Sequence, residues 1–125
     1  MRKKQQAEWL EIHRQMTDDP EQCMDLLLDW CGMKYKDLGD AIDRDPKTIS
    51  RTVKVTTKPS VETAVLICFG MNLPSVISEK LLDVLDCKLK PMNPEHQWIS
   101  EALHVKYPDP LWAVREYLEQ YGVEI

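Results

Sequence analysis

Residues 43–54 read DRDPKTISRTVK, and this stretch says more about the chain than any other of its length. Asp45 followed by Pro46 indicates a helix start, because the Asp side chain can cap the free N–H groups of a first turn and Pro needs no donor there. At 3.6 residues per turn, a helix over residues 46–54 separates two kinds of side chain. One face carries Lys47, Ser50, Arg51 and Lys54, and the other carries Ile49, Thr52 and Val53. The stretch therefore predicts a short helix with a cationic face and a small apolar face.

A second short helix is expected directly before this stretch, over residues 35–42. Its inward-facing residues are Leu38, Ala41 and Ile42. Only residues 43–45 join it to the helix over 46–54, and two short helices joined so tightly must cross steeply, as in a helix-turn-helix. Gly39 would let the two helices approach closely where they cross.

The cationic face stands out because the rest of the chain is acidic. The 125 residues carry a formal net charge of −5, whereas residues 33–58 hold seven Lys and Arg against four Asp and Glu. Residues 92–125 hold two Lys and Arg against six Asp and Glu. The net acidity disfavours loose, non-specific binding to nucleic acid, but a local basic stripe can still form an electrostatic footprint.

Further helices are expected on both sides of this pair. Asp or Asn followed by Pro predicts helix starts at Asp19-Pro20, Asn93-Pro94 and Asp109-Pro110, Ser60 predicts another cap, and Gly32 ends the helix from Pro20. One more helix is expected over residues 75–86. The apolar residues at helical spacing are Cys23, Leu26, Leu27 and Trp30; Val61, Ala64, Val65 and Cys68; Ile77, Leu81, Leu82 and Leu85; Trp98, Ile99, Ala102 and Leu103; and Leu111, Val114, Leu118 and Tyr121. No stretch alternates with period two, so the sequence predicts an all-α fold.

The length is that of one compact domain. We expect a helical extension over residues 1–18, in which Trp9, Ile12 and Met16 share a face that packs loosely on the rest. Residues 19–90 form the central helical domain. Residues 91–125 form a C-terminal helical pair, which makes one compact unit with residues 19–90.

Neither a membrane segment nor a metal or cofactor site is expected. The longest apolar run, AVLICF, is too short to cross a bilayer, and the N-terminus lacks the apolar stretch of a secretory signal. The four cysteines lie in apolar segments without a CxxC pair, as expected for buried, reduced thiols of a cytoplasmic protein. His96 and His104 fall near one helix face, but the segment offers no further ligands for a metal. No small-molecule ligand is evident.

Residues 33–74, MKYKDLGDAIDRDPKTISRTVKVTTKPSVETAVLICFGMNLP, resemble the Cro and phage-repressor type of helix-turn-helix, the lambda repressor-like XRE family. The matching features, in order, are Leu38-Gly39, Asp45, Thr48-Ile49-Ser50-Arg51, Lys58-Pro59-Ser60 and Leu73. The resemblance implies a repressor-like helix-turn-helix bundle with additional C-terminal helices. It also implies that residues 19–90 are a DNA-binding domain of a transcriptional regulator.

The resemblance further implies that the helix over 46–54 lies in the major groove of double-stranded DNA. Lys47, Ser50 and Arg51 are then the candidates for base contacts, since an Arg fork can hold guanine O6 and N7 together and Lys can reach the same acceptors. Phosphate contacts position a protein on the duplex without specifying sequence. The candidates for these are Tyr35, Arg44, Thr48, Lys54 and Lys58.

The sequence also departs from the family at several positions. Asp43 stands where the family often has a turn glycine, Arg44 where it has an apolar residue, Thr52 where it has a larger apolar group, and Val55 where a glycine often follows the recognition helix. These changes affect the expected geometry of the turn. They leave the helix cap and the cationic face in place.

The C-terminal helical pair is expected either to form a homodimer or to complete the core. Phage-repressor-type domains pair on half-sites about one helical turn apart, and aromatic residues are enriched at interface centres. The residues concerned are Trp98, Leu103, Trp112, Leu118 and Tyr121. Because cores and interfaces share this composition, the sequence leaves both roles open.

Other functional classes remain as alternatives to DNA binding. Enzyme chemistry finds little support, because the chain has no glycine-rich phosphate loop, no HExxH and no GxSxG motif. A protein-interaction or scaffold module that keeps the helix-turn-helix framework but has lost DNA binding is favoured by the net acidity and the altered turn. A third alternative is a regulatory segment of a larger enzyme.

Overall fold

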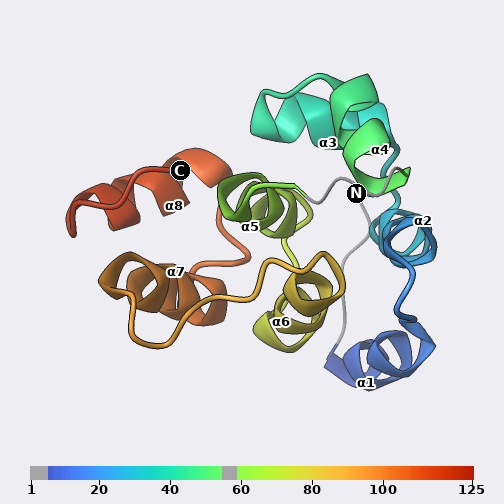
Figure 1. The fold of residues 1–125 in the computed structure, drawn as a ribbon, viewed down its shortest axis with the longest axis horizontal. Helices are drawn as coiled ribbons and strands as arrows, with labels where there is room; N and C mark the ends of the chain where they lie inside the picture. The colour runs from blue at the N-terminus through green and yellow to red at the C-terminus, as the bar shows by residue number, and fades with distance from the viewer. Residues whose placement is uncertain (1–5, 55–58) are drawn as a thin grey trace.

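The computed structural model describes residues 6–54 and 59–125, and Figure 1 labels their helices. These are α1 (Gln6–Gln15), α2 (Pro20–Cys31), α3 (Tyr35–Ile42), α4 (Pro46–Lys54), α5 (Val61–Gly70), α6 (Ser75–Val84), α7 (Pro94–Val105) and α8 (Leu111–Glu119). No strand occurs in the two described ranges, so the all-α expectation is confirmed there. Across the same ranges, no helix is long and apolar enough to cross a membrane.

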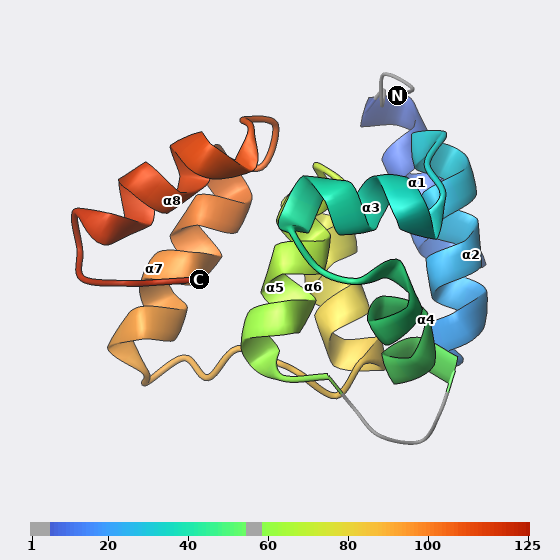
Figure 2. The same cartoon turned by 90° about the horizontal axis from the view of Figure 1, so that it is seen from above.

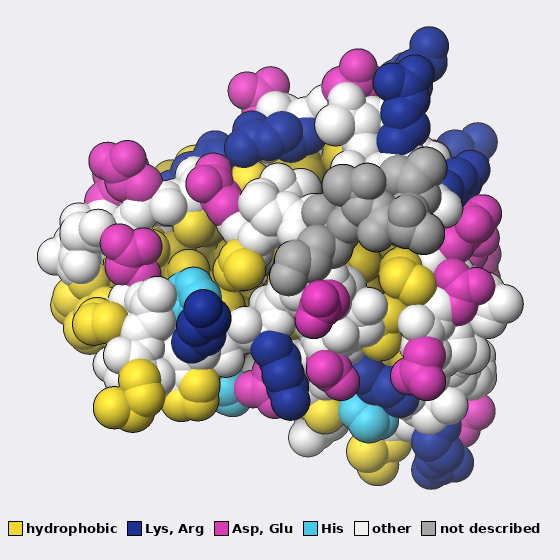
Figure 3. Space-filling model, in the orientation of Figure 1, with side chains coloured by type: hydrophobic (Ala, Val, Ile, Leu, Met, Phe, Trp, Pro, Cys, Tyr) yellow, Lys and Arg dark blue, Asp and Glu magenta, His cyan; other side chains and the backbone are white. Residues whose placement is uncertain are grey.

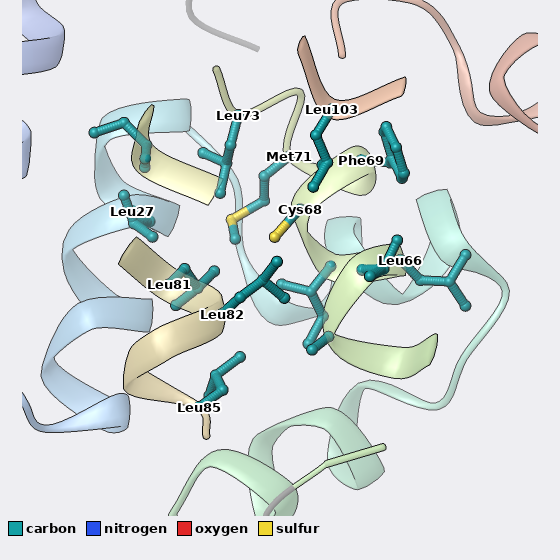
Figure 4. Packing of buried hydrophobic residues seen from close by; sticks show 14 of the residues in the cluster. Leu27, Leu66, Cys68, Phe69, Met71, Leu73, Leu81, Leu82, Leu85 and Leu103 are labelled. Atoms are coloured by element: carbon teal, nitrogen blue, oxygen red, sulfur yellow. The ribbon is translucent and has the colours of Figure 1, made fainter. Parts of the chain in front are cut away.

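Helix α5 lies at the centre of the fold. Every residue from Ala64 to Phe69 is buried, so this stretch has no face toward solvent. A helix that is apolar all round is one that the protein encloses. Helices α3, α6, α7 and α8 all contact α5, which runs through the middle of the molecule in Figures 1 and 2. Its side chains meet those of α2, α6 and α7 in the core (Figure 4).

Helix α1 packs against α2 and α6. Its Ile12 is 8% exposed, Met16 just beyond the helix is 5% exposed, and both belong to the same core as α5. Lys80 of α6 donates a hydrogen bond from Nζ to the carbonyl oxygen of His13. The packing of α1 is therefore closer than the loose contact that the sequence predicts.

Side-chain caps start four of the helices as predicted. In each case the side chain of the cap residue accepts a hydrogen bond from a backbone N–H of the first turn. The cap residues and their donors are Asp19 with Glu21 (3.0 Å), Asp45 with Lys47 (2.9 Å), Asn93 with Glu95 (2.9 Å), and Ser60 with Thr63 (3.1 Å). Gly32 ends α2 in the left-handed conformation, with φ of 68°. These local signals fix the starts of α2, α4, α5 and α7.

The predicted cap at Asp109-Pro110 is wrong. Helix α8 begins one residue later, at Leu111, and Pro110 is itself the N-cap residue without a capping side chain. Asp109 is engaged elsewhere: its carboxylate lies 4.0 Å from Lys106 Nζ, and its carbonyl oxygen accepts a hydrogen bond from Asn72 Nδ2 at 3.3 Å. The hydrogen bonds from Asn72, which is distant in sequence, hold the backbone of residues 107–109 outside the helix.

The turn between α3 and α4 brings the two helices close together. A Cβ on Gly39 would lie 2.6 Å from the carbonyl oxygen of Arg44 and 2.9 Å from Pro46 Cγ, which confirms that only glycine fits here without a shift. Asp43 has φ of 55° and ψ of 51°, the left-handed conformation that a turn glycine adopts most readily. The turn is therefore tight even though position 43 is Asp and not glycine.

Helix α3 lies on α5 through a second close approach. A Cβ on Gly70 would lie 2.5 Å from Ile42 Cγ2, so the absence of a side chain there lets α3 settle onto α5. Leu38 and Ile42 are fully buried as predicted. Ala41 is exposed, contrary to prediction, and Gly39 occupies the buried position on this face instead.

The C-terminal helices contribute both to the core and to the surface. Leu103 is 1% exposed and Leu118 is 0% exposed, so both complete the core. Trp98 is partly buried and stacks on Tyr121, with ring centroids 3.5 Å apart. Tyr121 lies beyond the end of α8 and is 43% exposed, and Trp112 is 66% exposed.

Candidate functional site

Helix α4 is anchored by its apolar face. Ile49 and Val53 are 2% and 4% exposed and join the core. Thr52 is half-buried, and its Oγ1 donates to the carbonyl oxygen of Thr48 at 2.7 Å. Because the hydroxyl is satisfied within the helix, Thr can occupy this position without an unpaired polar group. The opposite face of α4 is directed to solvent.

The solvent-directed face of α4 borders a shallow depression of about 430 Å³. Its lining residues are Tyr35, Pro46, Lys47, Ser50, Arg51 and Lys54. We call this surface the α4 face. It brings together all three residues predicted to contact bases and two of those predicted to contact phosphates. The sequence predicts Pro46 only as the first residue of the helix and does not indicate that it lines this depression.

The cations of the α4 face are available to an external partner. Lys47, Arg51 and Lys54 are exposed, and none forms an ion pair with another residue in the described ranges. Figure 3 shows Lys and Arg side chains along the edge of the molecule over α3 and α4, with a few Asp and Glu between them. Unpaired cations on one helix face generate a local positive potential on a protein of net charge −5.

Tyr35 lies in the α4 face with its hydroxyl closed off from solvent. The hydroxyl oxygen is buried and has no hydrogen-bond partner among the described residues. This burial, together with the nearby carboxylates of Asp25 and Glu21, raises the pKa of Tyr35 to about 12. Only the ring therefore faces the depression, and the hydroxyl cannot donate to a phosphate in the observed conformation.

The other predicted phosphate contacts lie outside this depression. Arg44 is directed toward the start of α5, where its guanidinium lies 3.6 Å from Glu62 and also donates to the carbonyl oxygen of Asp43 at 3.3 Å. Thr48 is exposed on α4 but does not line the depression. Lys58 is outside the described residues.

No metal centre accompanies this surface. Within residues 6–54 and 59–125, no three His, Cys, Asp or Glu side chains are grouped so that they could hold a metal ion. His96 and His104, both on α7, have different partners: His96 Nδ1 accepts from the N–H of Lys90 at 2.9 Å, and His104 Nδ1 lies 2.7 Å from the carbonyl oxygen of Ser100.

Comparison of the chain with family models, with curated proteins and with solved structures gives no match. The functional assignment of the α4 face therefore depends on its own residues: a short helix buried on one side, three exposed cations and a serine on the other, and a close, glycine-dependent junction with α3.

Proposed function

We propose that this protein is a sequence-specific DNA-binding regulator of transcription, with α3 and α4 as a helix-turn-helix. The observation that carries the proposal is the α4 face, where Lys47, Ser50 and Arg51 surround one depression on a helix whose other side is fixed in the core. A helix of this size fits the major groove, which is about 12 Å wide. The acidic remainder of the molecule would be repelled by phosphates, which favours approach through this face.

The α4 face divides into base-reading and backbone-binding residues. Arg51 is the candidate to hold guanine O6 and N7 with its fork, and Lys47 and Ser50 flank it at i−4 and i−1. Lys54 lies at the end of the helix and is the candidate for a phosphate. Tyr35 would then act through the packing of its ring, because its hydroxyl is buried.

The test is to select binding sites from a random duplex library and to measure affinity by fluorescence anisotropy. Arg51→Ala should cost about 1 to 3 kcal/mol on the best site and relax one base preference, whereas Lys54→Ala should weaken all sequences alike. Affinity should fall with salt at a log–log slope of about −0.9 for each neutralised phosphate.

Two matched variants serve as controls for this experiment. Arg14→Ala removes the same charge from an exposed position on α1, and it should leave DNA affinity unchanged. Tyr35→Phe should also leave affinity unchanged, since the hydroxyl is buried. If no duplex is bound at low salt, the proposal is wrong. If Arg14→Ala weakens binding as much as Arg51→Ala, the α4 face is not the contact surface.

The proposal includes pairing of two copies on adjacent half-sites, because one short recognition helix reads only a few base pairs. Leu103 and Leu118 are in the core and cannot serve as interface residues. The remaining candidates from the C-terminal pair are Trp112, 66% exposed on α8, Tyr121, 43% exposed, and the partly buried Trp98 that stacks on Tyr121.

Sedimentation of the free protein at micromolar concentration, and of the protein on its selected DNA, tests this pairing. Trp112→Ser should shift the dimer toward monomer, because it removes an exposed aromatic of the kind that dominates interface energies. Leu10→Ser is the control, since Leu10 is 64% exposed on α1. A wild-type monomer both free and on DNA would exclude the dimer.

A second candidate function is a protein-interaction module. The exposed Trp112 favours it, because a large aromatic side chain in water is typical of interaction surfaces. The two candidates differ in the salt series: a protein-interaction module would show no complex with any duplex at low ionic strength.

A further inference from the structure

A second pocket lies on the side of α6 and α7, separate from the α4 face. It has a volume of about 390 Å³ and shares no lining residue with that face. It is bounded by α6, by the connection over residues 85–93 and by the first two turns of α7. Its lining residues are Glu79, Leu82, Lys88, Leu89, Lys90, Pro91, His96, Gln97 and Ser100.

Hydrogen bonds from α7 hold the mouth of this pocket in shape. The N–H of Lys90 donates to His96 Nδ1 at 2.9 Å, and Gln97 Nε2 donates to the carbonyl oxygen of Pro91 at 2.7 Å. The first of these bonds leaves the imidazole proton on Nε2 when His96 is neutral, so the ring is fixed in one tautomer. The connection between α6 and α7 is therefore tied to α7 before any ligand arrives.

The lining combines an apolar wall with positive charge. Leu82 is 2% exposed, Leu89 packs against the core, and Pro91 adds a third apolar surface. Lys88 and Lys90 are exposed on either side of Leu89, and neither is ion-paired with any residue in the described ranges.

The one carboxylate in the lining already has a partner. Glu79 Oε1 lies 3.7 Å from His104 Nε2, on the side of α6 that faces α7. The lining therefore carries the two positive charges of Lys88 and Lys90 against the one negative charge of Glu79, a net positive charge. A pocket with an apolar wall and two unpaired ammonium groups is complementary to an organic anion.

We propose that this pocket binds a small monocarboxylate with an apolar body, such as a medium-chain fatty acid. The carboxylate would lie between Lys88 and Lys90, and the apolar body would cover Leu82 and Leu89. Pockets of 300 to 1,000 Å³ are typical for small ligands, so the volume suffices for one such molecule. The sequence alone offers no sign of this site, because its walls come from separate segments.

The test is an NMR titration of the free protein with octanoate as the probe, compared with octan-1-ol and octylamine at equal concentrations. Octanoate should shift the amide signals of residues 88–90 and 96–100 in a saturable way, and octylamine should not. Equal shifts with all three probes would mean that the pocket is an apolar patch without anion recognition, and the proposal would be wrong.

Variants then test whether Lys88 and Lys90 bind the carboxylate. The double variant Lys88→Gln/Lys90→Gln should bind octanoate about threefold to tenfold more weakly, since two exposed ion pairs are lost. The matched control, Arg14→Gln/Lys36→Gln, removes two exposed cations of α1 and α3 that line neither site and should bind octanoate as the wild type does. Unchanged binding by the first variant would overturn the proposal, as would the absence of shifts at residues 88–100. Neither outcome depends on whether the protein binds DNA.

Discussion

The backbone of Asp43 determines how α3 passes into α4. Its φ of 55° lies in the left-handed region, which costs L-residues energy and which Asp tolerates better than most because its side chain can bond locally. The N–H groups of Asp43 and Arg44 both donate to the carbonyl oxygen of Gly39, which ends α3. The turn is therefore made by backbone conformation and does not require a specific side chain at position 43.

We predict that Asp43→Gly stabilises the protein by about 0.5 to 1 kcal/mol, because glycine adopts positive φ without strain. Asp43→Val should destabilise it by about 1 to 2 kcal/mol, since a β-branched residue is strained there. Urea denaturation followed by circular dichroism measures both. Asp40→Val, at an exposed position within α3, controls for the loss of charge and the lower helix propensity of Val. Equal effects at positions 40 and 43 would contradict the role of φ.

Individual side chains of the α4 face show what a sequence can and cannot reveal. Lys47, Ser50 and Arg51 could be placed together because one helix carries all three, and helical geometry fixes their relative positions. The direction of Arg44 could not be predicted, since it depends on Glu62, which the fold brings within 3.6 Å. The buried hydroxyl of Tyr35 likewise depends on its packing beside α2.

Among the helices, the capped starts could be predicted almost to the residue. Caps are local signals between residues two or three apart, so α2, α4, α5 and α7 begin where the sequence indicates. Helix α8 differs because Asn72, distant in sequence, bonds to the carbonyl oxygens of Tyr107 and Asp109. The neighbours of α5 could not be predicted either, because a helix that is apolar on every side gives no preferred direction.

The caps lead to a prediction with an internal control. Asn93→Ala and Asp19→Ala should each destabilise the protein by about 0.5 to 2 kcal/mol, because each leaves N–H groups of a first turn without an acceptor. Asp109→Ala should cost less than about 0.5 kcal/mol, since its carboxylate caps nothing and its contact with Lys106 is exposed. Thermal or urea denaturation of the three variants measures the difference. A large loss on Asp109→Ala would show that its side chain does more than the observed contact.

For the molecule as a whole, the buried thiols predict that the free energy of unfolding falls at alkaline pH. All four cysteines are buried, as the sequence indicates, and burial raises the pKa of the Cys68 thiol from its ordinary value of 9.0 to about 12. The unfolded chain therefore loses this proton at a lower pH than the folded chain does. Stability from the buried thiol is complete below about pH 9 and is lost as pH rises toward 12.

We expect the free energy of unfolding to fall between pH 9 and pH 12, with the Cys68 thiol contributing at most about 1.4 kcal/mol per pH unit. Urea denaturation at stepped pH measures the slope. Cys68→Ala should reduce that slope, whatever its effect on stability at neutral pH, because it removes the titrating group. Cys68→Ala with an unchanged slope would assign the alkaline effect to other groups, such as Tyr35.

The enclosed position of α5 also bears on how the protein is made. Helices α7 and α8 cover one side of α5, and both follow it in the chain. On the ribosome, a nascent chain therefore exposes part of that apolar helix until α8 has emerged. Such exposed surface makes partly folded species prone to aggregate. Native packing must then be completed after most of the chain has been synthesised, and an elongation pause before α8 should increase the association of the nascent chain with chaperones.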